Sequence, residues 1–100
     1  MSAKGYLWAE LDITDPERFE AEYSVFVRPL LARHGAKFVI VDDRPRAMEG
    51  GRRLGRVVLV EFASPAAAQA FYDDPDYQAI IAARQRWAPG HVYLASGTDP

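Results

Sequence analysis

The segment from Arg56 to Arg84 constrains the fold of this chain more than any other part of the sequence. It begins with RVVLVEF, in which both alternating faces are mainly apolar, a pattern typical of a strand covered on both sides. Ser64-Pro65 then predicts the start of a helix, because serine caps free N–H groups and proline suits the first helical position. Asp73-Asp74-Pro75 interrupts that helix, since the residue before a proline avoids the helical region. We therefore expect a buried strand followed by a broken helix.

A weak internal repeat relates this segment to the beginning of the chain. Ala9, Leu11 and Ile13 match Val58, Val60 and Phe62, and Asp15-Pro16 stands where Ser64-Pro65 stands in the second copy. Further strands are expected at 37–41 and 91–96, which gives the order strand–helix–strand twice over, or βαββαβ. Right-handed crossovers then place the helices on one face of a four-stranded antiparallel sheet. The sequence thus predicts an α+β fold.

The first helix is expected to begin at Pro16 and to end near Gly35. Its apolar side chains recur at helical spacing and predict its buried face: Phe19, Tyr23, Phe26 and Leu30, widened by Val27 and Leu31. Pro29 is expected to kink the helix, because proline removes a backbone donor and crowds the preceding turn.

The two strands at 37–41 and 56–62 are both apolar on both faces, so each is expected to be covered on both sides. The residues DDRPR end the first of them. Ala47 and Met48 are candidates to resume strand pairing before Glu49-Gly50-Gly51, which is a turn signal.

The sheet face away from the helices is also apolar. It carries Tyr6, Trp8, Val57, Leu59 and Tyr93. A monomer rarely exposes an apolar patch larger than a few hundred square ångströms. At about 25 cal/mol per Å², burial of such a patch is worth several kcal/mol per chain. We therefore expect a homodimer in which two open sheet faces pack about a twofold axis.

The composition excludes several classes of function. The net charge of −2 lacks the basic excess of a general nucleic-acid binder. The chain has no cysteine and only two histidines, far apart in sequence, so neither thiol chemistry nor a metal site is expected, and nothing indicates a cofactor. Neither a signal peptide nor a membrane span is apparent, which favours a cytoplasmic protein without membrane contact. One domain is expected over residues 1–100, with its core at about 4–97.

The second half of the chain carries a recognisable pattern. Its residues are Ser64, Ala68, Tyr72, Pro75, Tyr77 and Arg84 in SPAAAQAFYDDPDYQAIIAAR. This pattern resembles the bacterial family catalogued as domain of unknown function 1330, and the opening KGYLWAELDITDPERFEAEY is similar to that family too. The resemblance implies a ferredoxin-like, dimeric α+β barrel. Its superfamily includes cofactor-free monooxygenases, haem-degrading enzymes and muconolactone-isomerase-like proteins, so it implies a fold without fixing a reaction.

The first group of candidate site residues lies on the open sheet face: Trp8, Glu10, Glu61, His91 and Tyr93. A carboxyl group and an imidazole in a partly apolar pocket are suited to proton transfer, because desolvation raises a carboxyl pKa toward neutrality. The alternative is that these residues form the rim of the dimer interface and are paired with arginines or water.

The second group of candidates lies on the helix side: Tyr23, Tyr77 and Arg84. The planar guanidinium of Arg84 suits a carboxylate or an enolate. The alternative is a structural arginine that caps a helix or pairs with Glu61 or Asp74. The two tyrosines are then core aromatics with satisfied hydroxyls.

Two functions agree with these residues. In the first, a homodimer binds a small organic molecule. If it is an enzyme, it catalyses proton transfer or cofactor-free oxygenation, with Glu61 or His91 as the base, Arg84 stabilising the anion, and Trp8 and Tyr23 lining the pocket. In the second, the protein is a non-catalytic binding or interaction module whose open sheet face only forms the dimer. The first function requires Arg84, Tyr23 and a carboxylate or histidine to meet at one cavity.

Overall fold

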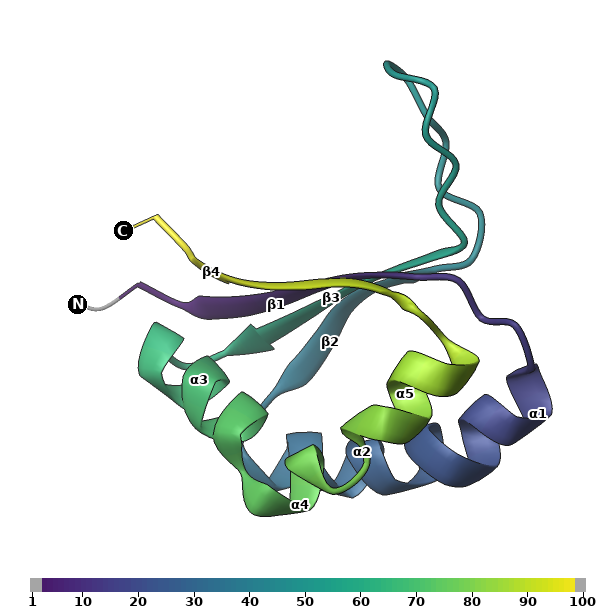
Figure 1. Ribbon diagram of the computed structural model, residues 1–100. Helices are drawn as coiled ribbons and strands as arrows, with labels where there is room; N and C mark the ends of the chain where they lie inside the picture. Colours follow the sequence, from purple (N-terminus) through teal and green to yellow (C-terminus); the bar gives the residue numbers. More distant parts are fainter. Residues whose placement is uncertain (1–2, 99–100) are drawn as a thin grey trace.

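The computed structural model describes residues 3–98, which form one sheet covered by helices on one face (Figure 1). The elements follow in the order β1 (Gly5–Leu11), α1 (Pro16–Phe19), the π-helical turn η1 (Glu20–Ser24), α2 (Val25–Arg33), β2 (Lys37–Asp42), β3 (Arg56–Phe62), α3 (Pro65–Asp73), α4 (Pro75–Gln78), α5 (Ile81–Trp87) and β4 (Gly90–Ser96). The strand order is β2-β3-β1-β4, and every neighbouring pair is antiparallel. The predicted α+β fold with βαββαβ order is confirmed.

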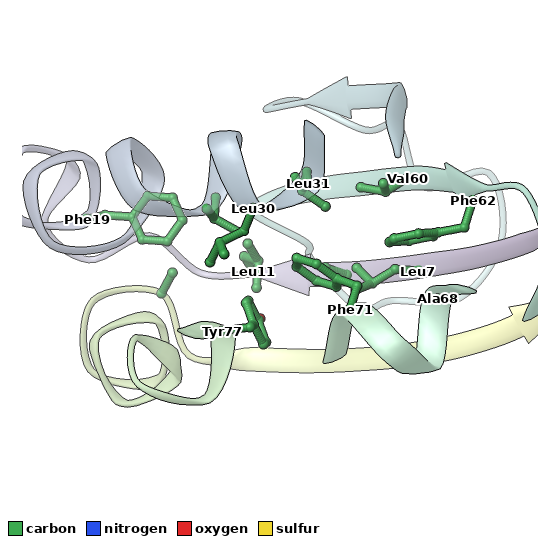
Figure 2. Close-up of a cluster of buried hydrophobic side chains, with 13 residues drawn as sticks. Leu7, Leu11, Phe19, Leu30, Leu31, Val60, Phe62, Ala68, Phe71 and Tyr77 are labelled. Carbon is green, nitrogen blue, oxygen red and sulfur yellow. The ribbon is translucent and has the colours of Figure 1, made fainter. Parts of the chain in front are cut away.

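The core fills the space between the sheet and the helices. Alternate residues of β1 are buried, and the register sets Leu7 opposite Val60 on one side and opposite Leu94 on the other. The largest fully buried side chains are Phe62, Phe71 and Tyr77. Figure 2 shows Phe71 and Tyr77 reaching from their helices toward β1. Burying an aromatic side chain stabilises the fold by about 1.5–3 kcal/mol, so this cluster holds the helix layer on the sheet.

Three helices, α1, α3 and α4, begin with a capping side chain that is followed by a proline. Asp15 accepts a hydrogen bond from the backbone N–H of Arg18, Ser64 accepts one from Ala67, and Asp74 accepts one from Asp76. A proline occupies the first helical turn in all three. Such caps contribute about 1 kcal/mol each. The predicted break at Pro75 is therefore a new helix start as well as a helix end.

The predicted buried face of the first helix is wrong at Phe26, whose side chain is 53% exposed. The cause is η1, which puts an extra residue into the turn over Glu20–Ser24. Beyond that turn, every side chain is rotated by one position, so Val27 takes the inward place that a regular helix would give to Phe26. Pro29 lies inside α2, which continues through it to Arg33.

The expected two-sided cover of β2 is not found in the single chain, because all six residues of this strand are exposed. β2 is an edge strand, and α3 packs against the other three strands instead. Ala47 and Met48 are not in a strand. They belong to the connection 43–55, which projects from the sheet on the side opposite the helices (Figure 1).

The shifted helix face predicts unequal costs for two substitutions in α2. Leu30→Ala is expected to lower the free energy of unfolding by about 2–5 kcal/mol, because Leu30 is buried and a cavity would remain. Phe26→Ala is expected to change it by less than about 0.5 kcal/mol, since Phe26 is exposed. Urea denaturation of both variants measures the difference. Equal losses would show that Phe26 is in the core.

Candidate functional site

A cavity of about 260 Å³ lies between the helix layer and the sheet. Its apolar walls come from the helix-facing sides of the strands and from the first helix: Leu7, Ala9, Leu11, Val58, Val60, Val92, Phe38, Val41, Phe19, Val27 and Leu31, with Phe71 from α3. Its polar lining consists of two phenols, one serine and three arginines: Tyr23, Tyr77, Ser24, Arg28, Arg56 and Arg84. No lining side chain is a carboxylate or an imidazole.

The hydroxyl groups of Tyr23 and Tyr77 form a hydrogen bond with an O···O distance of 2.9 Å. Tyr23 comes from η1 and Tyr77 from α4, so the bond joins the two helical halves of the chain. Burial raises the pKa of Tyr23 well above 10, with the neighbouring Tyr77 adding to the rise. Burial likewise raises the pKa of Tyr77. Both phenols are therefore neutral hydrogen-bond donors at physiological pH.

Arg84 is the buried cation of the cavity, with only 7% of its surface exposed. Its Nη1 donates a hydrogen bond to the backbone oxygen of Ala88 at 3.0 Å, which caps the last turn of α5. Its Nε has no hydrogen-bond partner among residues 3–98. The alternative pairing with Glu61 or Asp74 is not formed, because those two carboxylates bind other cations.

Asp74 holds the turn that carries Tyr77. Its carboxylate accepts hydrogen bonds from Arg33 Nη2 at 2.7 Å and from the backbone N–H of Asp76 at 2.9 Å, and it bonds His34 Nε2 at 2.8 Å. The bonds to His34 and Arg33 lower the pKa of Asp74 far below its usual value. The end of α2 is thereby fastened to the start of α4.

Glu61 lies on the open sheet face, as strand alternation predicted. It accepts a hydrogen bond from the Tyr6 hydroxyl at 3.1 Å, and Lys37 Nζ lies 3.4 Å from its carboxylate. Partial burial raises the pKa of Glu61, but the bonds from Tyr6 and Lys37 outweigh it and leave the pKa below its usual value. Glu61 is thus an ion-paired carboxylate.

The other open-face candidates surround Glu10. Trp8 Nε1 donates to the Glu10 carboxylate at 3.0 Å, and Arg52 Nη2 donates to it at 2.7 Å. His91 lies opposite Glu10 in the pairing of β1 with β4 and stacks on Tyr93, with ring centroids 6.4 Å apart. Glu10 and the side chains around it thus form a polar patch on the open sheet face, beside the exposed ring of Tyr93.

The structure divides the predicted site residues between the two faces of the sheet. Tyr23, Tyr77 and Arg84 meet at the helix-side cavity, whereas Glu61 and His91 lie on the opposite face. Glu61 lies opposite Tyr6 of β1 and His91 opposite Glu10, which separates them by about 13 Å along the strand. Neither of the two predicted alternative bases, Glu61 or His91, therefore meets Arg84 within one chain.

Sequence reasoning missed three polar residues of the cavity: Ser24, Arg28 and Arg56. Strand alternation contains the signal for Arg56, because it shares the helix-facing register of Val58 and Val60. The helical spacing of Ser24 and Arg28 contained no comparable signal, because η1 changes the faces of the helix on which these two residues lie.

Residues 3–98 contain neither a cluster suited to a metal ion nor a helix suited to crossing a membrane. Within residues 3–98, no three histidine, cysteine or acidic side chains gather where they could hold a metal ion. No helix of that range is long and apolar enough to cross a membrane.

The ion pair of Asp74 with Arg33 predicts a pH-dependent stability. The pKa of Asp74 is lowered in the folded state, so its contribution is present above the unfolded value of about 3.9 and is lost as the pH falls toward the folded pKa. Asp74→Asn keeps a capping side chain and removes the charge. The variant is therefore expected to be less stable than the wild type at pH 7, with the difference shrinking below about pH 4. Thermal denaturation from pH 3 to pH 7 measures this, and a difference independent of pH would contradict it.

Comparison with solved structures supports the fold described above. No curated protein matches the chain. A protein of unknown function from Rhodopseudomonas palustris superposes with a TM-score of 0.77 at 18% identity, covering 100% of this chain and 86% of that one. A ferredoxin-like dabb family protein from Mesorhizobium loti has a TM-score of 0.55 at 14% identity, covering 99% of both chains. A dimeric ferredoxin-like protein of unknown function from Thermobifida fusca has a TM-score of 0.55 at 15% identity, covering 96% of this chain and 92% of that one.

These structural similarities show that the chain has the ferredoxin-like fold. The family model described as Domain of unknown function (DUF1330) matches residues 4–98, almost the whole chain. The repeated strand–helix unit, the capped break at Pro75 and the buried Tyr77 and Arg84 all lie within the matched range. The chain therefore belongs to the DUF1330 family.

Proposed function

We propose that this protein is a small-molecule-binding homodimer whose ligand occupies the cavity between the helices and the sheet. The observation that carries the proposal is the cavity itself, with a volume of about 260 Å³. For comparison, an engineered apolar cavity of about 150 Å³ binds benzene. Apolar walls with a few converging polar groups are the usual composition of a small-molecule site. A compact aromatic or branched organic molecule fits this space.

The lining residues support binding more directly than turnover. They supply phenol and guanidinium donors, and they include no carboxylate or imidazole to act as a general base. If the protein is an enzyme, the helix-side cavity contributes stabilisation of a negative oxygen through Arg84. Proton transfer by Glu61 or His91 would need a second site on the open face. The lowered pKa of Glu61 makes it a weaker base than a carboxylate in an apolar pocket.

The open sheet face supports the homodimer. Tyr93 is 53% exposed and Ile40 is 38% exposed, and both lie on the face that no helix covers. Trp8 and Leu59 lie opposite each other between them. The dimeric protein from Thermobifida fusca has the same fold. A second copy packed on this face would bury these side chains. The face would then serve as an interface, which is also its role in a non-catalytic interaction module.

A cavity-filling substitution tests the binding proposal. Val58 lines the cavity, whereas Leu59 is its neighbour in β3 on the opposite face of the sheet. Two small aromatic compounds, 4-fluorobenzoate and 4-fluorobenzamide, serve as probes of the cavity. Val58→Phe is expected to abolish the binding of both, because the added ring occupies their space. Leu59→Phe is expected to leave binding unchanged. Line broadening in ¹⁹F NMR measures both. Undiminished binding by a folded Val58→Phe protein would place the ligand elsewhere.

The dimer proposal is tested by two residues of equal exposure on opposite faces. Tyr93 and Phe26 are each 53% exposed, but only Tyr93 lies on the open sheet face. Tyr93→Arg is expected to yield monomers at micromolar concentration, because a charge would be buried without a partner. Phe26→Arg is expected to remain dimeric. Sedimentation velocity measures both. A monomeric wild type at the same concentration would rule out the proposed dimer.

A further inference from the structure

The three arginines of the cavity differ in how their charges are neutralised. Arg28 forms an ion pair with Glu20, and Arg56 forms one with Asp43. None of the ion pairs among residues 3–98 includes Arg84, although Arg84 is far more buried than either of the others. The cavity therefore holds one unneutralised positive charge.

The guanidinium of Arg84 is oriented by its bond to the chain. Nη1 is bonded to the backbone oxygen of Ala88, which leaves the edge formed by Nε and Nη2. The N–H groups of that edge are parallel, and this arrangement binds the two oxygens of a carboxylate side by side. Nε is buried and has no partner among residues 3–98. The donor geometry therefore favours a planar anionic group with two oxygens.

The Tyr23–Tyr77 pair supplies one further donor. In a hydrogen bond between two hydroxyls, one proton is shared and the other is left for another acceptor. The charge of Arg84 lies near enough to lower the pKa of both phenols, although burial, the larger effect, raises them. The phenol pair and the guanidinium thus belong to one electropositive part of the cavity.

An unpaired buried charge carries a large desolvation cost. Apolar side chains form most of the remaining wall, so a hydrated inorganic ion would leave that wall uncovered. A dianion would lack a second free cation, because Arg28 and Arg56 already have acidic partners. The lining therefore matches one negative charge on an apolar body.

We propose that the ligand of this cavity is a small monocarboxylic acid, whose carboxylate is held by the Nε–Nη2 edge of Arg84 and by the Tyr23–Tyr77 hydroxyl pair, with its hydrocarbon part against the strands. This inference rests on the proposed function, since it requires the helix-side cavity to be the binding site. It adds the charge and the orientation of the ligand.

The test uses two probes of equal shape, 4-fluorobenzoate and 4-fluorobenzamide, titrated into the wild-type protein and followed by ¹⁹F NMR. The carboxylate is expected to bind about tenfold or more tightly than the amide, because hydrogen bonds to a charged group are stronger than those between neutral groups. Equal affinities, or tighter binding of the amide, would overturn the charge assignment and leave the cavity proposal standing. No binding of either probe would overturn both proposals.

Substitutions then locate the charge that the carboxylate uses. Arg84→Met is expected to remove the preference for the carboxylate while the amide still binds, because the side-chain volume is nearly kept. Arg28→Met is the matched control: it also removes a lining arginine, but one already paired with Glu20, and the preference is expected to remain. Loss of the preference in Arg28→Met with retention in Arg84→Met would overturn the assignment.

Tyr23→Phe provides a test that does not depend on removing a buried charge. It deletes one hydroxyl of the phenol pair and keeps the ring that packs on Phe19 at a centroid distance of 5.2 Å. The affinity for 4-fluorobenzoate is expected to fall several-fold, while the affinity for 4-fluorobenzamide falls less. An unchanged ratio of the two affinities would remove the phenol pair from the proposed site.

Discussion

The packing of Tyr77 is the contact on which the rest of the structure depends. Its ring lies 4.5 Å from that of Phe71 and 5.6 Å from that of Tyr72, measured between centroids, and only 1% of its surface is exposed. Its hydroxyl reaches Tyr23 from the other helical half. One side chain thus closes the core and supplies a polar group of the cavity. The bonds of Asp74 to Arg33 and His34 keep it in place by fixing the turn just before it.

Most of the fold could be predicted because it follows local rules. The three capped starts, each with a proline, set the helix boundaries, and period-two alternation set the faces of β1, β3 and β4. What local rules did not reveal is which strand lies at the edge. β2 has the composition of a buried strand, yet the helix layer does not extend over it, because strand order is decided by the whole topology. The π-helical turn likewise left no recognised signal in the residue spacing.

Three of the six polar residues that line the cavity could be selected from the sequence, but their assembly could not be predicted. Tyr23, Tyr77 and Arg84 were selected from the sequence, and the structure brings them to one cavity. Glu61 and His91 were assigned to the open face by alternation, and they lie there. To combine them with Arg84 would require a passage through the sheet, which continuous pairing of β1 with both neighbours closes. Whether the charge of Arg84 stays unpaired depends on where carboxylates such as Glu61 and Asp74 find their partners, and those contacts join residues far apart in the sequence.

The π-helical turn has a consequence for the size of the cavity. Phe19 and Tyr23 come before the end of this turn and Val27 and Leu31 after it, and all four contribute to one wall of the cavity. The same residues wound as a regular α-helix would direct Phe26 inward in place of Val27, and the larger ring would occupy part of the space. The extra residue of this turn therefore helps to set the width of the cavity, because it decides which side chain forms the wall.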